Sequence, residues 1–160
     1  MTEGLIIYPA TTEEDMDVVR ELFREYQAWL GVDLCFQGFE DELASLPGVY
    51  APPLGRLYLV NDDATGRIAG CIAIRPRDNG RCEMKRLFVR DAWRGRGLGR
   101  KLAELSLVEA KKAGHTHMCL DTLGHLTSAI ELYGSMGFQE IEAYYDNPLD
   151  DVRYMEIELR

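Results

Sequence analysis

A nine-residue segment, RGRGLGRKL (Arg94 to Leu102), combines four basic side chains with three glycines at the point where a helix is expected to begin. The first backbone amides of a helix have no partner within the helix, and the helix dipole adds positive potential there. Glycine removes the side chains that would keep an anion away from these amides. The segment therefore has the chemistry of a phosphate site, although its glycines could also serve only to make a turn.

The charge distribution supports a small anionic ligand. The net charge is −9, yet seven of the 18 basic residues lie between Lys85 and Lys101, where Asp91 is the only acid. A local charge of +6 in an acidic chain favours a small polyanion, unless it is simply a solvated basic face. Nucleic-acid binding requires a broadly basic surface, so we predict no nucleic-acid partner.

Two common phosphate motifs do not match this segment. A dinucleotide-binding fingerprint that starts at Gly95 needs glycine at the position of Arg100, and a P-loop needs Gly-Lys-Ser/Thr where Gly99 is followed by Arg100 and Lys101. The pattern that remains is Arg94-x-x-Gly97-x-Gly99, and its meaning depends on the elements around it.

Hydrophobic periodicity and turn residues predict those elements. Thr11 and Thr12 are candidate caps for the first helix, with Glu14 and Asp15 three residues further on. The expected order is β, α, α, β, β, β, α, β, α, β, β. Strands are expected at 5–8, 57–60, 68–74, 82–89, 117–122, 138–141 and 152–159, and helices at about 13–30, 39–46, 98–114 and 129–136.

Length and composition predict one mixed α/β domain of residues 1–160, since the chain has 160 residues of which 46% are hydrophobic. No apolar run approaches the roughly 20 residues needed to cross a membrane, and the N-terminus lacks a secretory signal. The four cysteines are scattered without a C-x-x-C pair, which is typical of reduced thiols in a cytoplasmic protein.

In this context the chain resembles the GNAT superfamily of acyl-CoA-dependent N-acetyltransferases. The segment LFVRDAWRGRGLGRKL matches the strand, basic linker, glycine loop and helix of the family signature, and AIELYGSMGFQEI resembles its late helix with a Tyr-x-x-x-Gly-Phe ending. The resemblance covers essentially residues 5–160 and is weakest between residues 31 and 56. It implies a mixed, mostly antiparallel central sheet of about seven strands flanked by about four helices.

The resemblance also implies how acetyl-CoA, the expected co-substrate, is held. Backbone groups of Leu87 and Val89 would pair with the pantetheine arm, and the amides near Leu87 and Phe88 would donate to the oxyanion. Those side chains can pack in the core at the same time. The pyrophosphate would lie on the backbone amides of residues 94–100, namely Arg94, Gly95, Arg96, Gly97, Leu98, Gly99 and Arg100.

Acetyl transfer requires a neutral amine, donors for the tetrahedral oxyanion and a proton for the leaving thiolate. Glu83, eleven residues before Arg94, is the candidate base at a spacing that some branches of the superfamily use; water chains, or an exposed Glu83–Lys85 surface pair, are the alternatives. Tyr133, the tyrosine of the late-helix motif, is the candidate acid, or else a tyrosine at the edge of the core. The asparagine often found seven residues earlier is replaced by Leu126.

The strand HTHMCLD alternates His115, His117, Cys119 and Asp121, a spacing that could suggest metal ligands. We expect His115 in a turn and Cys119 in the core instead, and we predict no metal.

By resemblance, the acceptor site lies between the first two helices and the last two strands. Aromatic residues there could line a pocket, and nearby acidic residues could attract a cationic amine or only confer solubility. The candidates are Tyr26, Trp29, Phe36, Tyr144 and Tyr145, with Asp33, Glu40, Asp146, Asp150 and Asp151. We predict direct transfer of acetyl, in a ternary complex, to a primary amine of a small molecule. A protein lysine or N-terminus, a non-catalytic acyl-CoA-binding module and a homodimer formed by the late strands remain open.

Overall fold

The structure, a computed structural model, describes residues 3–160, so the expected domain of residues 1–160 begins two residues before the described part. The predicted order of elements is confirmed. The elements are β1 (Leu5–Pro9), α1 (Glu13–Leu30), α2 (Phe39–Ser45), β2 (Arg56–Asp62), β3 (Arg67–Pro76), β4 (Arg81–Val89), α3 (Leu98–Lys112), β5 (His117–Leu123), α4 (Thr127–Met136), β6 (Gln139–Ile141) and β7 (Val152–Glu158), with short 3-10 turns η1 (Cys35–Gln37), η2 (Gly48–Tyr50) and η3 (Asp91–Trp93).

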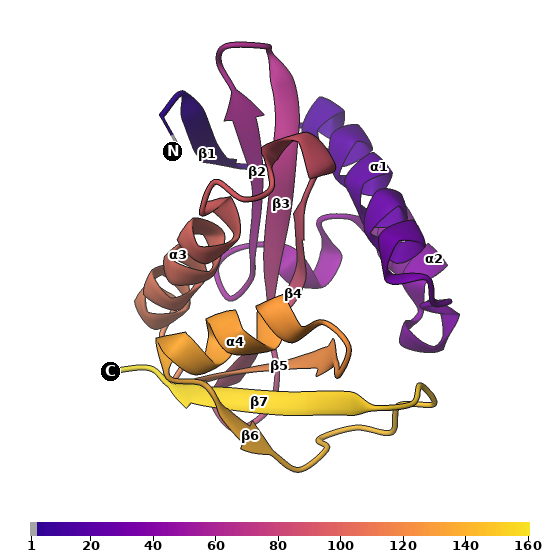
Figure 1. The fold of residues 1–160 in the computed structure, drawn as a ribbon, viewed down its shortest axis with the longest axis vertical. Helices are drawn as coiled ribbons and strands as arrows, with labels where there is room; N and C mark the ends of the chain where they lie inside the picture. The colour runs from indigo at the N-terminus through magenta and orange to yellow at the C-terminus, as the bar shows by residue number, and fades with distance from the viewer. Residues whose placement is uncertain (1–2) are drawn as a thin grey trace.

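The seven strands form one sheet in the order β1-β2-β3-β4-β5-β7-β6. Every neighbouring pair is antiparallel except β4 and β5, which run parallel. This is the mixed, mostly antiparallel sheet that the sequence predicted, and four α-helices flank it (Figure 1). No helix in the described part of the chain is long and apolar enough to cross a membrane.

Both faces of the central strands are buried, which is why these strands read as nearly continuous apolar runs. Side chains alternate between faces along a strand. In β2, Leu57 and Leu59 pack in a core cluster with α1 and α2, whereas Tyr58 and Val60 join the cluster that contains α3 and α4. Figure 1 shows α1 and α3 on opposite sides of the sheet.

The first helix begins at the cap that its sequence predicts. Of the two candidates, Thr12 is the N-cap: its hydroxyl accepts from the Asp15 amide at 3.0 Å, and the Asp15 carboxylate accepts from the Thr12 amide at 3.1 Å. This reciprocal pair satisfies two amides that the helix leaves free, and it fixes the start of α1 before its buried face.

Strand β4 contains a bulge at Arg86, which has a positive φ of 60°. Phe88 lies opposite Cys71 and Lys85 opposite Ala73, so Arg86 and Leu87 together face a single residue of β3. The Arg86 side chain is 2% exposed and donates to both carboxylate oxygens of Glu42 in α2, at 3.0 and 2.9 Å. Since a bulge bends its strand and sharpens the local twist, this ion pair holds a bent β4 against α2.

The pairing of β4 with β5 covers only residues 81–83, which face residues 117–119. Beyond Glu83 the two strands separate, and β4 from Met84 to Val89 has no strand partner on that side within the described residues. The sheet is therefore open in its middle, where it presents unpaired backbone groups.

Candidate active site

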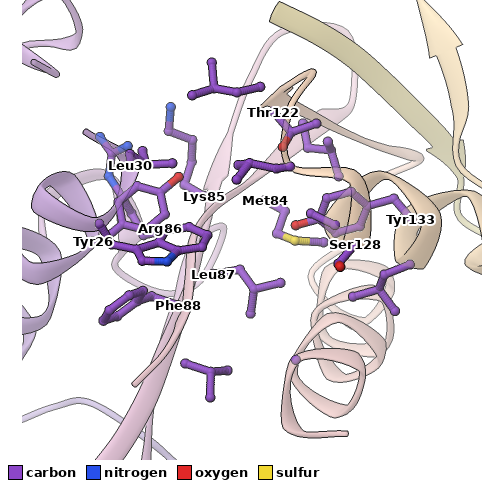
Figure 2. A pocket seen from close by; sticks show the side chains of 18 of the residues that line it. Tyr26, Leu30, Met84, Lys85, Arg86, Leu87, Phe88, Thr122, Ser128 and Tyr133 are labelled. Carbon is purple, nitrogen blue, oxygen red and sulfur yellow. The ribbon is translucent and has the colours of Figure 1, made fainter. Parts of the chain in front are cut away.

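A cavity of about 320 Å³ lies where β4 and β5 part. Its walls come from β4, β5, the start of α3, α4 and the end of α1, and Figure 2 shows side chains of β4 facing Tyr133 of α4 across it. Of the predicted cofactor residues, eight line the cavity: Leu87, Phe88, Val89, Arg94, Gly95, Gly97, Leu98 and Gly99. Arg96 and Arg100 do not.

The glycine segment before α3 leaves both backbone donors and space. Gly95 and Gly97 have φ of 78° and 79°, a conformation that favours glycine. Gly99 has no such requirement, and a Cβ placed on any of the three meets no atom within 4 Å. The amides of Leu98, Gly99 and Arg100 lie in the first turn, before the first intrahelical bond, which runs from Lys101 to Gly97. The three glycines thus border open space that a ligand can occupy.

Arg94 anchors the glycine loop through its own hydrogen bonds, unlike the glycines that follow it. Its amide donates to the Asp91 carbonyl at 3.2 Å, and its Nε donates to the Val89 carbonyl at 2.8 Å. Its guanidinium lies over the ring of Trp29, 5.0 Å from the centroid. Arg94 therefore ties the glycine loop to the end of β4 and to α1, and its amide belongs to a turn rather than to the set that faces open space.

Tyr133 is buried at the cavity wall, with its ring 5.7 Å from that of Phe138. Burial raises the pKa of its phenol above the ordinary 10.0, so the group keeps its proton at neutral pH. Leu126, where the family often has asparagine, is the N-cap residue of α4 and makes no side-chain cap. The hydroxyl-bearing Ser128, five residues before Tyr133 in α4, also lines the cavity (Figure 2).

Glu83 is not part of an exposed surface pair, because its side chain is 1% exposed. Its carboxylate accepts from Arg77 at 3.1 Å and from the Tyr144 hydroxyl at 2.6 Å, and Lys85 lies 3.9 Å away. Glu83 is not among the residues that line the cavity. Its role as the base stays a prediction, and the geometry places it behind the wall with both oxygens engaged.

The acceptor end of the cavity differs in part from the aromatic pocket expected from the sequence. Tyr26 and Trp29 line the cavity, but Phe36, Tyr144 and Tyr145 do not. The two late tyrosines form a layer behind the wall, where Tyr144 donates to Glu83 and Tyr145 donates to Asp121. The polar residues that line this end include Gln37, Lys85, Arg86, Asp121 and Asn147, and Arg86 donates to the Gln37 side-chain oxygen at 3.0 Å.

Sequence reasoning considered Lys85 as part of the basic segment and as a neighbour of Glu83, and Asp121 only as part of a metal pattern. On β5, Asp121 directly follows the apolar residues 118–120, and it lies just beyond the last residue that pairs with β4. A polar residue at this position in a buried strand was the signal that could have placed it in the site. His115 lies in the turn after α3, with its Nε2 2.8 Å from the Leu54 carbonyl, and Cys119 is buried. No cluster of three or more His, Cys, Asp or Glu suited to a metal occurs in residues 3–160.

Comparison with known proteins settles the family. Residues 53–140 match the family described as the acetyltransferase (GNAT) domain. The chain belongs to the GNAT acetyltransferase family. It is an acyl-CoA-dependent N-acetyltransferase.

Individual relatives agree in sequence and in fold. An uncharacterized N-acetyltransferase of Schizosaccharomyces pombe is 43% identical over 147 residues, which cover 91% of this chain and 90% of that protein. A GNAT acetyltransferase of Staphylococcus aureus shares the fold with a TM-score of 0.80 at 21% identity, over 98% of this chain and 99% of the other. A Salmonella typhimurium protein solved with its cofactor acetyl-CoA gives a TM-score of 0.71 at 19% identity, over 99% and 95% of the two chains.

Proposed function

We propose that this GNAT enzyme transfers acetyl from acetyl-CoA to a primary amine of a small molecule, directly and within a ternary complex. The observation that carries the proposal is the continuity of one cavity, which joins the unpaired edge of β4, the glycine-rich start of α3 and the phenol of Tyr133. These parts would supply a diphosphate site, an arm site and a proton donor, which follow the order of the diphosphate, the pantetheine arm and the thioester in acetyl-CoA.

Binding would use the backbone more than side chains. The amides of Gly95 to Arg100 would hold the pyrophosphate, because they combine the helix dipole with space that the three glycines leave open. Backbone groups of Leu87 and Val89 would pair with the amides of the pantetheine arm, as an added strand pairs with a free edge. The arm would then occupy the gap that β5 leaves beside β4.

The reaction forms a C–N bond and breaks a C–S bond. The amine nitrogen attacks the thioester carbon, and the carbonyl oxygen, which becomes negative, accepts from backbone amides at the bulge near Leu87 and Phe88. When the C–S bond breaks, the sulfur takes the proton of the Tyr133 phenol. The amine proton leaves through water, because Glu83 lies behind the wall and already accepts from Arg77 and Tyr144.

A small acceptor is supported by the bridge that Gln37 makes at the acceptor end. Its side-chain oxygen accepts from Lys85 at 3.0 Å, and its side-chain nitrogen donates to the Tyr145 hydroxyl at 3.3 Å. This bridge joins η1 to the segment between β6 and β7 and narrows the approach for a protein chain. We also propose that the enzyme works in the reducing cytoplasm, because buried Cys71, Cys82 and Cys119 are all free thiols.

Two measurements test the proposal. Isothermal titration calorimetry should show that one acetyl-CoA binds per chain, and a screen of primary amines, followed by release of free thiol, should show acetylation of small acceptors. Failure of acetyl-CoA to bind the folded protein would overturn the proposed site. Binding with acetylation of protein lysines or N-termini alone would overturn the small-molecule assignment.

A further inference from the structure

The acceptor end of the cavity holds two opposite charges that the acetyl-transfer chemistry does not use. Lys85 and Asp121 both line it. The two other charged lining residues are accounted for elsewhere, because Arg86 is paired with Glu42 and Arg94 anchors the glycine loop. What surrounds Lys85 and Asp121 therefore decides which acceptor fits.

Lys85 belongs to a buried group with surplus positive charge. Its side chain is 9% exposed, and its ammonium contacts Glu83 at 3.9 Å and donates to the neutral amide of Gln37 at 3.0 Å. Glu83 is also the partner of Arg77 at 3.1 Å. One carboxylate thus contacts two cations, and Asp121 acts on Lys85 only through its charge, from beyond ion-pair distance. A second carboxylate that contacts Lys85 would therefore be stabilised.

Asp121 shows the opposite imbalance. Its Oδ2 accepts from the Tyr145 hydroxyl and, at 3.4 Å, from the Asn147 side-chain amide, and both donors are neutral. These donors orient the carboxylate and leave its negative charge uncompensated by a contacting cation. Such a carboxylate suits an ammonium group that enters the cavity near Tyr133.

The remaining wall at this end is apolar. Val32 and Leu34 follow α1, Leu123 ends β5, and Leu149 precedes β7. The cavity of about 320 Å³ must also admit the acetyl-bearing arm, so the acceptor is small. An acceptor with a short apolar side chain would place that side chain against these apolar residues.

We propose that the acceptor is an α-amino acid with an apolar side chain, whose ammonium is placed by Asp121 and whose carboxylate is placed by Lys85 and Gln37. This inference rests on the proposed function and names its substrate class. A polyamine fits the site poorly, because its second ammonium would lie beside Lys85 and the surplus positive charge around it.

A matched series of ligands tests the proposal on the wild-type enzyme. L-leucine, L-leucinamide, 3-methylbutylamine and spermidine each present a primary amine, accompanied by a carboxylate, a neutral amide, no other polar group and further cations, respectively. We expect kcat/KM for leucine to exceed that for leucinamide by about 10- to 100-fold, the effect of one charged contact. Calorimetric titration of leucine into the enzyme saturated with CoA should show binding without turnover.

A variant that removes the charge of Lys85 then tests whether this residue contacts the acceptor carboxylate. Lys85→Met should bring the leucine-to-leucinamide ratio close to one while the affinity for acetyl-CoA is unchanged. Lys112→Met makes the same substitution at an exposed lysine at the end of α3 and should keep the wild-type ratio. If Lys85→Met does not fold, the ligand series on the wild-type enzyme still tests whether the acceptor is an amino acid.

The outcomes separate this inference from the function on which it rests. Loss of acetyl-CoA binding in the wild-type enzyme would remove the proposed function itself. If acetyl-CoA binds and leucine neither binds the CoA complex nor outperforms leucinamide, or if spermidine is the best of the four, the amino-acid assignment is overturned and the acetyltransferase proposal stands. An unchanged ratio in folded Lys85→Met would overturn the role of Lys85.

Discussion

Tyr133 and Glu83 are both buried, but burial has different consequences for them. The Tyr133 phenol lines the cavity, and burial raises its pKa, so it can hold a proton until a thiolate appears. The Glu83 carboxylate is surrounded by donors and cations, which satisfy it as an anion. We therefore expect Tyr133 to react and Glu83 to hold other residues in place.

For Tyr133 we predict that the conservative variant Tyr133→Phe lowers kcat by about 10- to 1000-fold, because the thiolate loses its proton donor. The affinity for acetyl-CoA should remain close to wild type, since the ring still fills its place beside Phe138. Steady-state release of free thiol and calorimetric titration measure the two quantities. Wild-type kcat in Tyr133→Phe would show that the leaving group is protonated by another donor.

For Glu83 we predict a loss of stability that exceeds the loss of turnover. Glu83→Gln leaves Arg77 and Lys85 without their shared anion, which should lower the free energy of unfolding by about 2–4 kcal/mol, less than for a fully buried pair because Arg77 keeps contact with water. Urea denaturation measures this change.

The matched control for that variant is Glu140→Gln, which removes an exposed pair with Arg153 and should leave stability unchanged. We expect kcat of Glu83→Gln to fall by less than about tenfold. A fall of several hundredfold at unchanged stability would instead establish Glu83 as the base that the sequence predicted.

At the scale of elements, the start of α3 contains a glycine that we expect to matter for binding acetyl-CoA but not for folding. Gly99 has an ordinary φ and faces open space, so the fold does not require glycine there. Gly99→Leu should keep or slightly raise stability, because leucine favours a helix by up to about 1 kcal/mol over glycine. The same side chain would fill the proposed diphosphate site and lower the affinity for acetyl-CoA at least about 100-fold.

Gly134→Leu is the control for this variant, since Gly134 also lies in a helix, faces open space and does not line the cavity. Thermal denaturation and calorimetric titration of both variants measure stability and affinity separately. Wild-type affinity in Gly99→Leu would mean that the diphosphate lies elsewhere.

The sequence could predict the elements because their signals are local. The capping box at Thr12 and Asp15, the Gly97 turn and the Gly137 cap each depend on neighbours within four residues. The bulge at Arg86 could not be predicted in this way, because an arginine rather than a glycine adopts the positive φ there. It depends on Glu42, which lies 44 residues earlier in the chain.

The same limit applies to the site. The glycine loop and Tyr133 were found from motifs, whereas the burial of Glu83 depends on Arg77 and Tyr144 together. The contact between Asp121 and Tyr145 joins two elements that only the completed sheet brings together. Motifs thus predict the cofactor end of the cavity, whereas the shape of the proposed acceptor end depends on tertiary packing.

At the scale of the whole molecule, buried thiols and an acidic chain limit stability at high pH. Burial raises the pKa of Cys71 and Cys82 to about 12 and that of Cys119 to about 11, from 9.0. Above about pH 9 the unfolded chain releases these protons and the native chain retains them, so the free energy of unfolding falls as pH rises. Lys85, whose pKa is lowered by burial, acts in the opposite direction. It is outnumbered by the three thiols and by buried tyrosines such as Tyr26, whose pKa burial raises from 10.0 to about 12.

We therefore predict that the urea midpoint decreases steadily between about pH 8.5 and about pH 10.5. Cys119→Ala should make this decrease shallower, because one of the three raised groups is removed. Denaturation curves at several pH values under reducing conditions measure both slopes. A midpoint that stays constant over this range would contradict the burial of the thiols.

If the pantetheine arm binds beside β4 as proposed, the co-substrate completes the sheet where β4 and β5 separate. In the free enzyme the amides from Met84 to Val89 that point toward β5 have no strand to protect them, so they should exchange with deuterated solvent faster than those of β2 and β3. An arm that fills the gap would slow that exchange. In each catalytic cycle the gap between β4 and β5 would then be filled when the co-substrate binds and emptied when CoA leaves.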